Sequence, residues 1–238
     1  MRNRKKGGSI FIFVIIGVIL VGVLVYFLFF SSFFKIQNIF LVSNTEDYDK
    51  FNTFFQTYIN TNILFFNKNE FVGNLKDKFP IVDNVDIKKK FPNSLEIKIE
   101  YRKPKYYVCS EECFLIDKKG FVFQKVDKSF NFDELVKLEN GFNNIKVGKY
   151  IASESDFNKI DFILNNLAGN NIKVLSVDLK NETVYFNNED FSIIFALVED
   201  VNWQLEKFFT ALKKIKDTED MNKLEYIDVR FGDRVYYK

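Results

Sequence analysis

Histidine is absent from this chain of 238 residues, and cysteine occurs only twice, at Cys109 and Cys113. Without histidine, Ser-His-Asp and Cys-His catalysis and histidine-based metal sites are excluded. A glycine-rich phosphate loop is missing too: residues 141–149 look superficially similar, but their spacing is too long and Tyr150 stands where Ser or Thr is needed. We therefore expect no catalytic residues, no cofactor and no metal site.

Paired carboxylates could still support glycosidase chemistry, because such pairs form in space and cannot be recognised in one sequence. Glu111 and Glu112 are the obvious pair, but adjacent acids in a short turn are more often solvated. An anchored cell-wall hydrolase or transferase stays as an alternative for which the sequence offers no motif.

One long apolar run is present, from Ile10 to Phe30, and it contains no charged residue. At about 1.5 Å per residue, a helix of this length reaches roughly 32 Å, which matches a hydrocarbon core of about 30 Å. We predict a transmembrane helix over residues 10–30. A cleaved signal peptide is the alternative, but its apolar region normally has about 7 to 15 residues, and no A-x-A-like cleavage site follows this run.

The residues before the run, 1–9, contain four basic side chains and no acidic one: Arg2, Arg4, Lys5 and Lys6. The positive-inside rule places this tail in the cytoplasm and the rest of the chain outside. The formal net charge of +2 depends on the tail, because without it 30 Lys plus Arg (34 − 4) face 32 Asp plus Glu, a balance of −2. The basic charge thus reflects topology, and we expect no nucleic-acid partner.

Three residues separate the two cysteines. Apolar segments at 106–108 and 114–116 predict a hairpin with a three-residue loop, in which Cys109 and Cys113 lie opposite each other at about 4.5–5.5 Å between Cα atoms. This distance and an outward-facing compartment permit a disulfide. A pair of reduced, half-buried cysteines is the other interpretation, and the sequence leaves both open.

A first module, from about residue 34 to 103, has the pattern β-α-α-β-β. A strand is predicted over 36–42, a helix after a capping box at Ser43 and Glu46, a second helix after Asn67, and then a hairpin. Apolar side chains at helical spacing mark the first helix: Phe51, Phe54, Phe55, Tyr58 and Ile59. We expect these aromatic residues to form the core of the module.

Residues 104–238 read as a mixed, β-rich module with two helices. One helix is marked by apolar residues from Phe157 to Leu167 and the other by apolar residues from Val201 to Ile215. Alternation or apolar runs predict strands at 115–123 (as a hairpin), 175–179, 183–187, 191–196, 226–231 and 234–237.

Several segments of the first module resemble a POTRA domain: Phe34-Lys35-Ile36, Ile63-Leu64-Phe65-Phe66, Lys90-Phe91-Pro92-Asn93-Ser94-Leu95-Glu96-Ile97 and Tyr101-Arg102-Lys103-Pro104. Its place after a single N-terminal span, together with the ending Ile227-Asp228-Val229-Arg230, resembles the FtsQ/DivIB family of bacterial cell-division proteins. Ser43, where Gly is common, and Phe91, where Trp is common, are mild departures.

The resemblance implies an α+β chain in four parts: a cytoplasmic tail at 1–9, a transmembrane helix at 10–30, a POTRA domain at 34–103 and an FtsQ/DivIB-type β domain at 104–238. It also implies a non-enzymatic scaffold at the division septum, in the plasma or inner membrane. The expected partners are single-span division proteins of the FtsB/DivIC and FtsL type and the septal wall synthase complex, with no small-molecule substrate.

The resemblance places partner binding near the last strand, by addition of a partner strand to an open sheet edge. The positions carried over are Phe231, Gly232, Val235, Tyr236 and Tyr237. Alternatively, the two tyrosines cap the core and Lys238 is frayed. A membrane-anchored POTRA chaperone or translocation factor is the alternative function.

Overall fold

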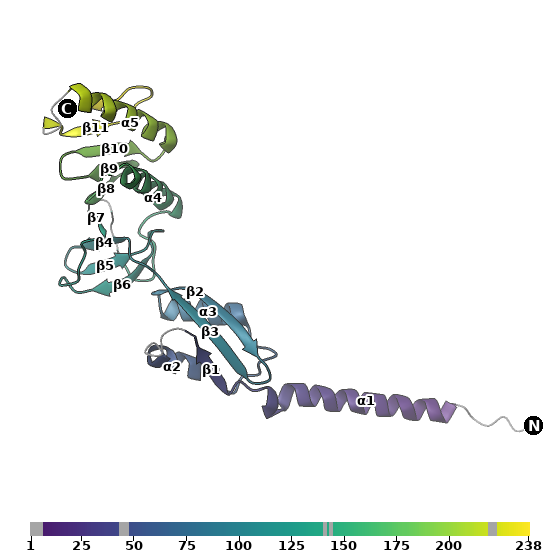
Figure 1. Cartoon of the computed structure of the whole chain (residues 1–238). Coiled ribbons are helices and arrows are strands. Elements are labelled where there is room, and N and C mark those ends of the chain that lie inside the picture. Colours follow the sequence, from purple (N-terminus) through teal and green to yellow (C-terminus); the bar gives the residue numbers. More distant parts are fainter. Residues whose placement is uncertain (1–6, 43–47, 140–141, 143–144, 219–222) are drawn as a thin grey trace, which may run out of the picture. The chain divides into compact units, whose positions relative to one another are not determined.

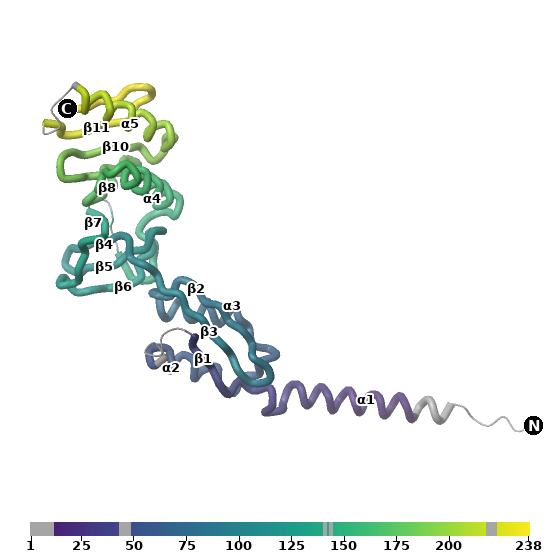
Figure 2. Tube along the Cα trace, in the orientation of Figure 1, coloured from purple at the N-terminus to yellow at the C-terminus, as the bar shows by residue number. Residues whose placement is uncertain are grey.

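The computed structural model describes residues 7–42, 48–139, 142, 145–218 and 223–238. The chain divides into two compact units, Met1–Tyr101 and Arg102–Lys238. Figures 1 and 2 follow them by colour along the sequence, from purple in the first unit to yellow at the end of the second.

The first unit begins with one long helix, α1, over Gly7–Phe30. Within it, Ile12–Phe30 has a mean hydropathy of 3.2 and is, in the part of the chain that the structure describes, the one segment long and apolar enough to cross a membrane. Its side chains from Ile12 onward are nearly all exposed, on every side of the helix. A helix that is apolar all round and not covered by protein suits lipid as its solvent.

The rest of the first unit has the β-α-α-β-β order of a POTRA domain (Figure 1), which confirms the predicted fold class. Its elements are β1 Asn38–Leu41, α2 Tyr48–Gln56, α3 Lys68–Lys78, β2 Val82–Lys90 and β3 Ser94–Tyr101. The strand order is β1-β3-β2, with β1 parallel and β2 antiparallel to β3. One face of this sheet is covered by apolar side chains of the helices, and the core contains five buried phenylalanines: Phe51, Phe54, Phe55, Phe66 and Phe71.

Two boundaries in this unit differ from those predicted. The first helix ends at Gln56, so Tyr58 and Ile59 lie in the turn beyond it, where Asn60 has φ +65° and donates its N–H to the Ile36 carbonyl. Both side chains still pack on the core. The first strand starts late because Ile36 donates to Thr61 and not to β3. The predicted capping box of Ser43 and Glu46 lies outside the described residues.

The second helix starts as the sequence predicts. The side chain of Asn67 accepts hydrogen bonds from the N–H groups of Asn69 and Glu70, at 3.1 and 3.3 Å, which satisfies two of the free donors at the start of α3. Phe71 and Leu75 then face the core one turn apart.

In its described residues, the second unit is a nine-stranded sheet with two helices. Its strands are β4 Tyr106–Cys109, β5 Cys113–Ile116, β6 Val122–Val126, β7 Val136–Leu138, β8 Ser176–Lys180, β9 Thr183–Asn187, β10 Ser192–Ala196, β11 Tyr226–Asp228 and β12 Tyr236–Tyr237. The order across the sheet is β12-β11-β10-β9-β8-β7-β4-β5-β6. The helices α4, Glu154–Gly169, and α5, Val201–Thr218, pack their apolar faces on it.

Both helices follow the predicted periodicity, but three strand predictions need correction. Leu175 is exposed and precedes β8, and the predicted strand over 226–231 ends at Asp228. The last strand is only Tyr236–Tyr237. The sequence does not reveal β7, because three residues show no alternation; β7 exists through parallel pairing with β4 and β8.

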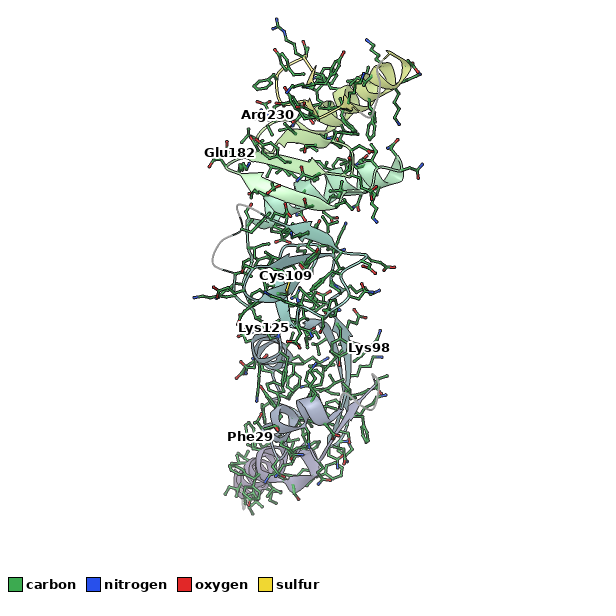
Figure 3. The ribbon with its side chains drawn as sticks, turned by 90° about the vertical axis from the view of Figure 1, so that its left-hand side faces the viewer. Phe29, Lys98, Cys109, Lys125, Glu182 and Arg230 are labelled. Atoms are coloured by element: carbon green, nitrogen blue, oxygen red, sulfur yellow. A yellow bond between two sulfur atoms is a disulfide. The ribbon has the colours of Figure 1, made fainter. Side chains whose placement is uncertain are left out.

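Cys109 and Cys113 face each other at the end of the β4–β5 hairpin, with 4.2 Å between their Cα atoms, and are joined as a disulfide (Figure 3).

We expect a thiol reagent to label neither cysteine in the unreduced chain and both after reduction and unfolding. Replacing both with serine should lower the free energy of unfolding by at most about 2 kcal/mol, because the closed loop is short. Chemical denaturation measures this loss, and labelling before reduction would contradict the pairing.

Candidate functional site

The C-terminal segment forms one edge of the nine-stranded sheet. β12 pairs antiparallel with β11, and no strand among those described pairs with its outer side. Lys238 and Tyr226 exchange backbone hydrogen bonds, at 3.3 and 3.4 Å. Because alternate residues of an antiparallel strand bond to the neighbour, the N–H and C=O groups of Tyr237 face the open edge. The same alternation, extended to the residue before β12, predicts that Val235 also faces outward.

Three aromatic side chains lie on this edge, and each is about half exposed: Phe231, Tyr236 and Tyr237. The rings of Phe231 and Tyr236 meet edge to face at 5.6 Å between centroids. Lys238 is not frayed, since its backbone pairs with Tyr226 and its Nζ lies 2.9 Å from Glu225. The chain end of the alternative prediction, in which both tyrosines cap the core, is thus not frayed in the structure, and each of the two tyrosines is only about half buried.

A buried lysine of α5 fixes the turn that leads into β12. Lys207 donates from Nζ to the carbonyl oxygens of Val229 and Gly232, both at 2.6 Å. Burial lowers the pKa of Lys207, against the attraction of nearby carboxylates. Gly232 has φ +38°, in the left-handed region where glycine has no penalty, which lets the chain reverse. The sequence gives no signal for this role of Lys207.

Asp228 and Arg230 hold the other side of the turn, where β11 ends (Arg230 is labelled in Figure 3). The guanidinium of Arg230 donates to both carboxylate oxygens of Asp228, at 2.6 to 3.1 Å, and to the Thr183 hydroxyl at 3.3 Å. The hydrogen bond from Arg230 to Asp228 raises the pKa of Arg230. The Asp and the Arg of the Ile-Asp-Val-Arg ending thus have a structural role, because they bond to each other at the end of β11.

A groove of about 620 Å³ runs beside the open edge. Its walls come from α5 and from the C-terminal segment: Trp203, Glu206, Lys207, Thr210, Ala211, Lys214, Ile215, Asp233, Val235 and Tyr237. The structure thus brings Val235 and Tyr237, of the five predicted positions, to the groove, whereas Phe231, Gly232 and Tyr236 lie on the edge outside it. Trp203, half exposed in the groove, has no counterpart in the sequence prediction.

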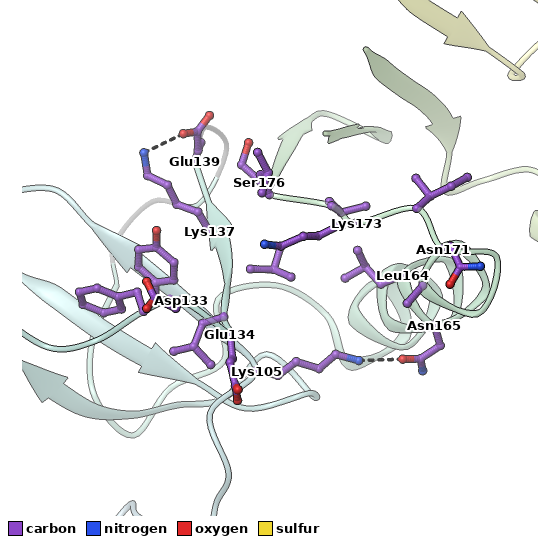
Figure 4. Close-up of a pocket in the computed structure, with 18 residues that line it drawn as sticks. Lys105, Asp133, Glu134, Lys137, Glu139, Leu164, Asn165, Asn171, Lys173 and Ser176 are labelled. Carbon is purple, nitrogen blue, oxygen red and sulfur yellow. Dashed lines mark hydrogen bonds and ion pairs between the residues drawn. The ribbon is translucent and has the colours of Figure 1, made fainter. Parts of the chain in front are cut away.

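A second cavity, of about 740 Å³, lies along β7 and α4 (Figure 4). Three of its charged residues are paired: Lys105 with Asp161 at 2.5 Å and with Asn165 at 3.0 Å, and Lys137 with Glu139 at 2.7 Å. The predicted acid pair lies elsewhere, since Glu111 and Glu112 are exposed and Glu112 contacts Lys125. Nothing in this arrangement singles out a reacting group.

The sequence of this chain is similar to those of known proteins. Residues 55–102 match the model of the FtsQ-type POTRA domain. A cell division protein DivIB of Clostridium acetobutylicum is 30% identical over 185 residues, which cover 74% of this chain and 71% of that protein. The chain belongs to the FtsQ/DivIB family. DivIB of Clostridium tetani is 27% identical, in a match that covers 90% of this chain and 83% of that protein. DivIB of Clostridium botulinum is 25% identical, in a match that covers 100% of this chain and 94% of that protein.

Membership in the FtsQ/DivIB family makes this chain a cell-division protein with one candidate transmembrane helix, a POTRA domain and a β-rich second unit. The family likeness reaches the C-terminal edge, because the match to DivIB of Clostridium botulinum covers 100% of the chain.

Proposed function

We propose that this FtsQ/DivIB protein is a non-enzymatic, single-pass scaffold of the bacterial division machinery at the septum. The family supports a role in division, and the apolar helix supports an anchor in the cell membrane. The basic residues before the helix support a cytoplasmic N-terminus, with the POTRA domain and the second unit outside. The partners are other single-span division proteins of the FtsB/DivIC and FtsL type and the septal wall synthase complex.

The open edge of β12 is the observation that carries this proposal. An extended partner segment beside β12 can exchange backbone hydrogen bonds with Tyr237 and Val235. Since β12 has only two residues, backbone pairing alone supplies few bonds. Side chains must add to the affinity, and alternate side chains of the partner can enter the groove next to Trp203.

Proline at position 235 tests strand addition, because it removes an N–H group that faces the open edge. We expect Val235→Pro, in the full chain held in lipid nanodiscs, to bind the outer segments of FtsB/DivIC-type proteins about tenfold more weakly, a loss of about 1.4 kcal/mol. The matched control is Val235→Thr, which keeps the N–H and the β-branched shape and should bind within about twofold. Titration by calorimetry measures both.

Unchanged affinity of Val235→Pro, with a circular dichroism spectrum that matches the parent chain, would remove strand addition at this edge. Capture of unfolded outer-membrane clients in place of division proteins would instead favour the chaperone alternative.

A further inference from the structure

The end of the apolar helix α1 touches a loop of the POTRA domain within the first unit. The side-chain amide of Asn62 donates to the Leu28 carbonyl at 2.7 Å and lies 3.4 Å from the Phe29 carbonyl. These carbonyls belong to the last turn of the helix, which has no intrahelical donors left for them. Asn62 also accepts a hydrogen bond from the Leu64 N–H at 2.9 Å, so one side chain fixes both the helix end and the loop.

Aromatic rings from both sides gather at this junction. Phe65, from the loop, lies 4.5 Å from Phe29 between ring centroids (Phe29 is labelled in Figure 3). Phe33, in the short helix η1 over Ser32–Phe34, folds back to 6.2 Å from Phe27. These rings are large apolar groups, yet Phe65 is 56% exposed and Phe29 and Phe33 are similarly open. Such a group of exposed aromatic residues marks an interaction surface.

The position of Phe65 relative to the bilayer follows from where the apolar helix α1 ends. Phe29 is the last residue but one of α1 and lies inside the apolar segment Ile12–Phe30. If that segment crosses the bilayer, its outer end reaches the headgroup boundary, where aromatic side chains are enriched. Phe65 is in contact with Phe29 and therefore lies at the same depth, next to lipid.

The charges around the loop also suit a lipid surface. Residues 31–42 and 51–69 contain no acidic residue. Lys89 reaches the Leu64 carbonyl with Nζ, at 3.5 Å, and Lys68 reaches the Ile87 carbonyl at 2.5 Å. Burial and the neighbouring charge of Lys68 lower the pKa of Lys89, as expected for two cations held close together. Lipid phosphates are the counter-ions that a membrane offers to such a pair.

We propose that residues 62–66 of the POTRA domain form a second, peripheral membrane contact, in which Phe65 enters the boundary between headgroups and acyl chains beside Phe29. The occupant is the lipid bilayer, because the surface continues directly from the apolar face of α1. This inference rests on the proposed function, since it takes α1 to span the membrane. Its consequence is that the POTRA domain is held at the membrane surface and does not swing freely on its anchor.

Tryptophan reporters in the full chain test this contact. The background carries Trp203→Phe, which removes the single native tryptophan. Vesicles contain phosphatidylcholine and phosphatidylglycerol brominated near the carbonyl end of the acyl chain. We expect the fluorescence of Phe65→Trp to fall about twofold, as for a side chain at the acyl boundary. The matched control is Phe40→Trp, which is equally exposed, on a strand that leads away from α1 (Figure 1), and should keep its fluorescence.

A third reporter, Val21→Trp, separates the two proposals in matched vesicles whose lipids are brominated near the methyl end of the acyl chain, because position 21 lies in the middle of the span. If Val21→Trp is quenched and Phe65→Trp is quenched no more than Phe40→Trp, the anchor stands and the loop contact is wrong; the junction then faces protein or water. If Val21→Trp is not quenched, the anchor and the proposed membrane scaffold are wrong as well.

Discussion

Replacing Asp117 with alanine is expected to lower the free energy of unfolding of the second unit by about 3–5 kcal/mol, because it removes one partner of a buried ion pair. Asp117 and Arg102 are in contact at 2.5 Å, and their side chains are only 8% and 10% exposed. Asp117 also accepts the N–H groups of Lys119 and Phe121, at 2.8 and 3.0 Å, so it holds the β5–β6 turn. The variant leaves the Arg102 charge buried without this carboxylate.

The same turn is packed too tightly to adjust. Gly120 has φ +81°, and an added Cβ would lie 2.6 Å from the Phe157 ring of α4. The guanidinium of Arg102 stacks on Phe121 at 4.1 Å, so it cannot leave for water without losing that contact. These neighbours keep the cost of Asp117→Ala near the upper end for single substitutions.

Glu112→Ala is the matched control, because Glu112 and Lys125 are also 2.5 Å apart but are 51% and 55% exposed. An exposed pair contributes at most about 1 kcal/mol, since water screens it. Urea denaturation of the full chain in detergent measures both variants. Equal losses for Asp117→Ala and Glu112→Ala would contradict the role assigned to burial.

Replacing Lys207 with methionine is expected to weaken partner binding at the C-terminal edge at least about tenfold and to lower the free energy of unfolding by about 3 kcal/mol. Methionine fills a similar volume but cannot donate to the carbonyls of Val229 and Gly232. Hydrogen bonds from a charged group contribute about 1.5–3 kcal/mol each, and the carbonyl of the buried Val229 is costly to leave without its donor. Without these bonds, the turn that positions Val235 and Tyr237 opens.

Lys213→Met is the control, because Lys213 lies on the same helix but is exposed. Affinity for the FtsB/DivIC-type partner should fall at least about tenfold for Lys207→Met and stay within about twofold for Lys213→Met. Amide hydrogen exchange should show faster exchange in residues 226–237 of the first variant alone. A Lys207→Met chain that binds normally would show that the edge does not depend on this turn.

The helices of both units could be predicted because their signals are local. Asn67 caps α3, and apolar residues at helical spacing mark α4 and α5, so neighbours within a few turns decide the structure. Predictions became less accurate where distant residues decide. The end of α2 is set by the bond from Asn60 to Ile36, and β7 exists only through its pairing with β4 and β8.

In the candidate site too, local sequence signals were predictable and contacts between distant residues were not. The sequence placed the partner-binding region at the C-terminus through its family resemblance, and the structure has an open sheet edge there. The sequence could not indicate the groove, since Trp203 is 30 residues or more from Asp233 and Tyr237 along the chain. The role of Lys207 was hidden for the same reason: a lysine on a helix normally indicates a solvated face.

By itself, the sequence determined the long apolar helix, the absence of histidine chemistry, the periodic helices and the family, because each depends on composition, order or local spacing. The tertiary structure alone decided which strand is left at the sheet edge, which backbone groups of Tyr237 face outward, and that Phe65 meets Phe29 at the end of the apolar helix. The physical reason is that strand pairing and side-chain burial join residues far apart in the chain, and one sequence carries no direct record of those contacts.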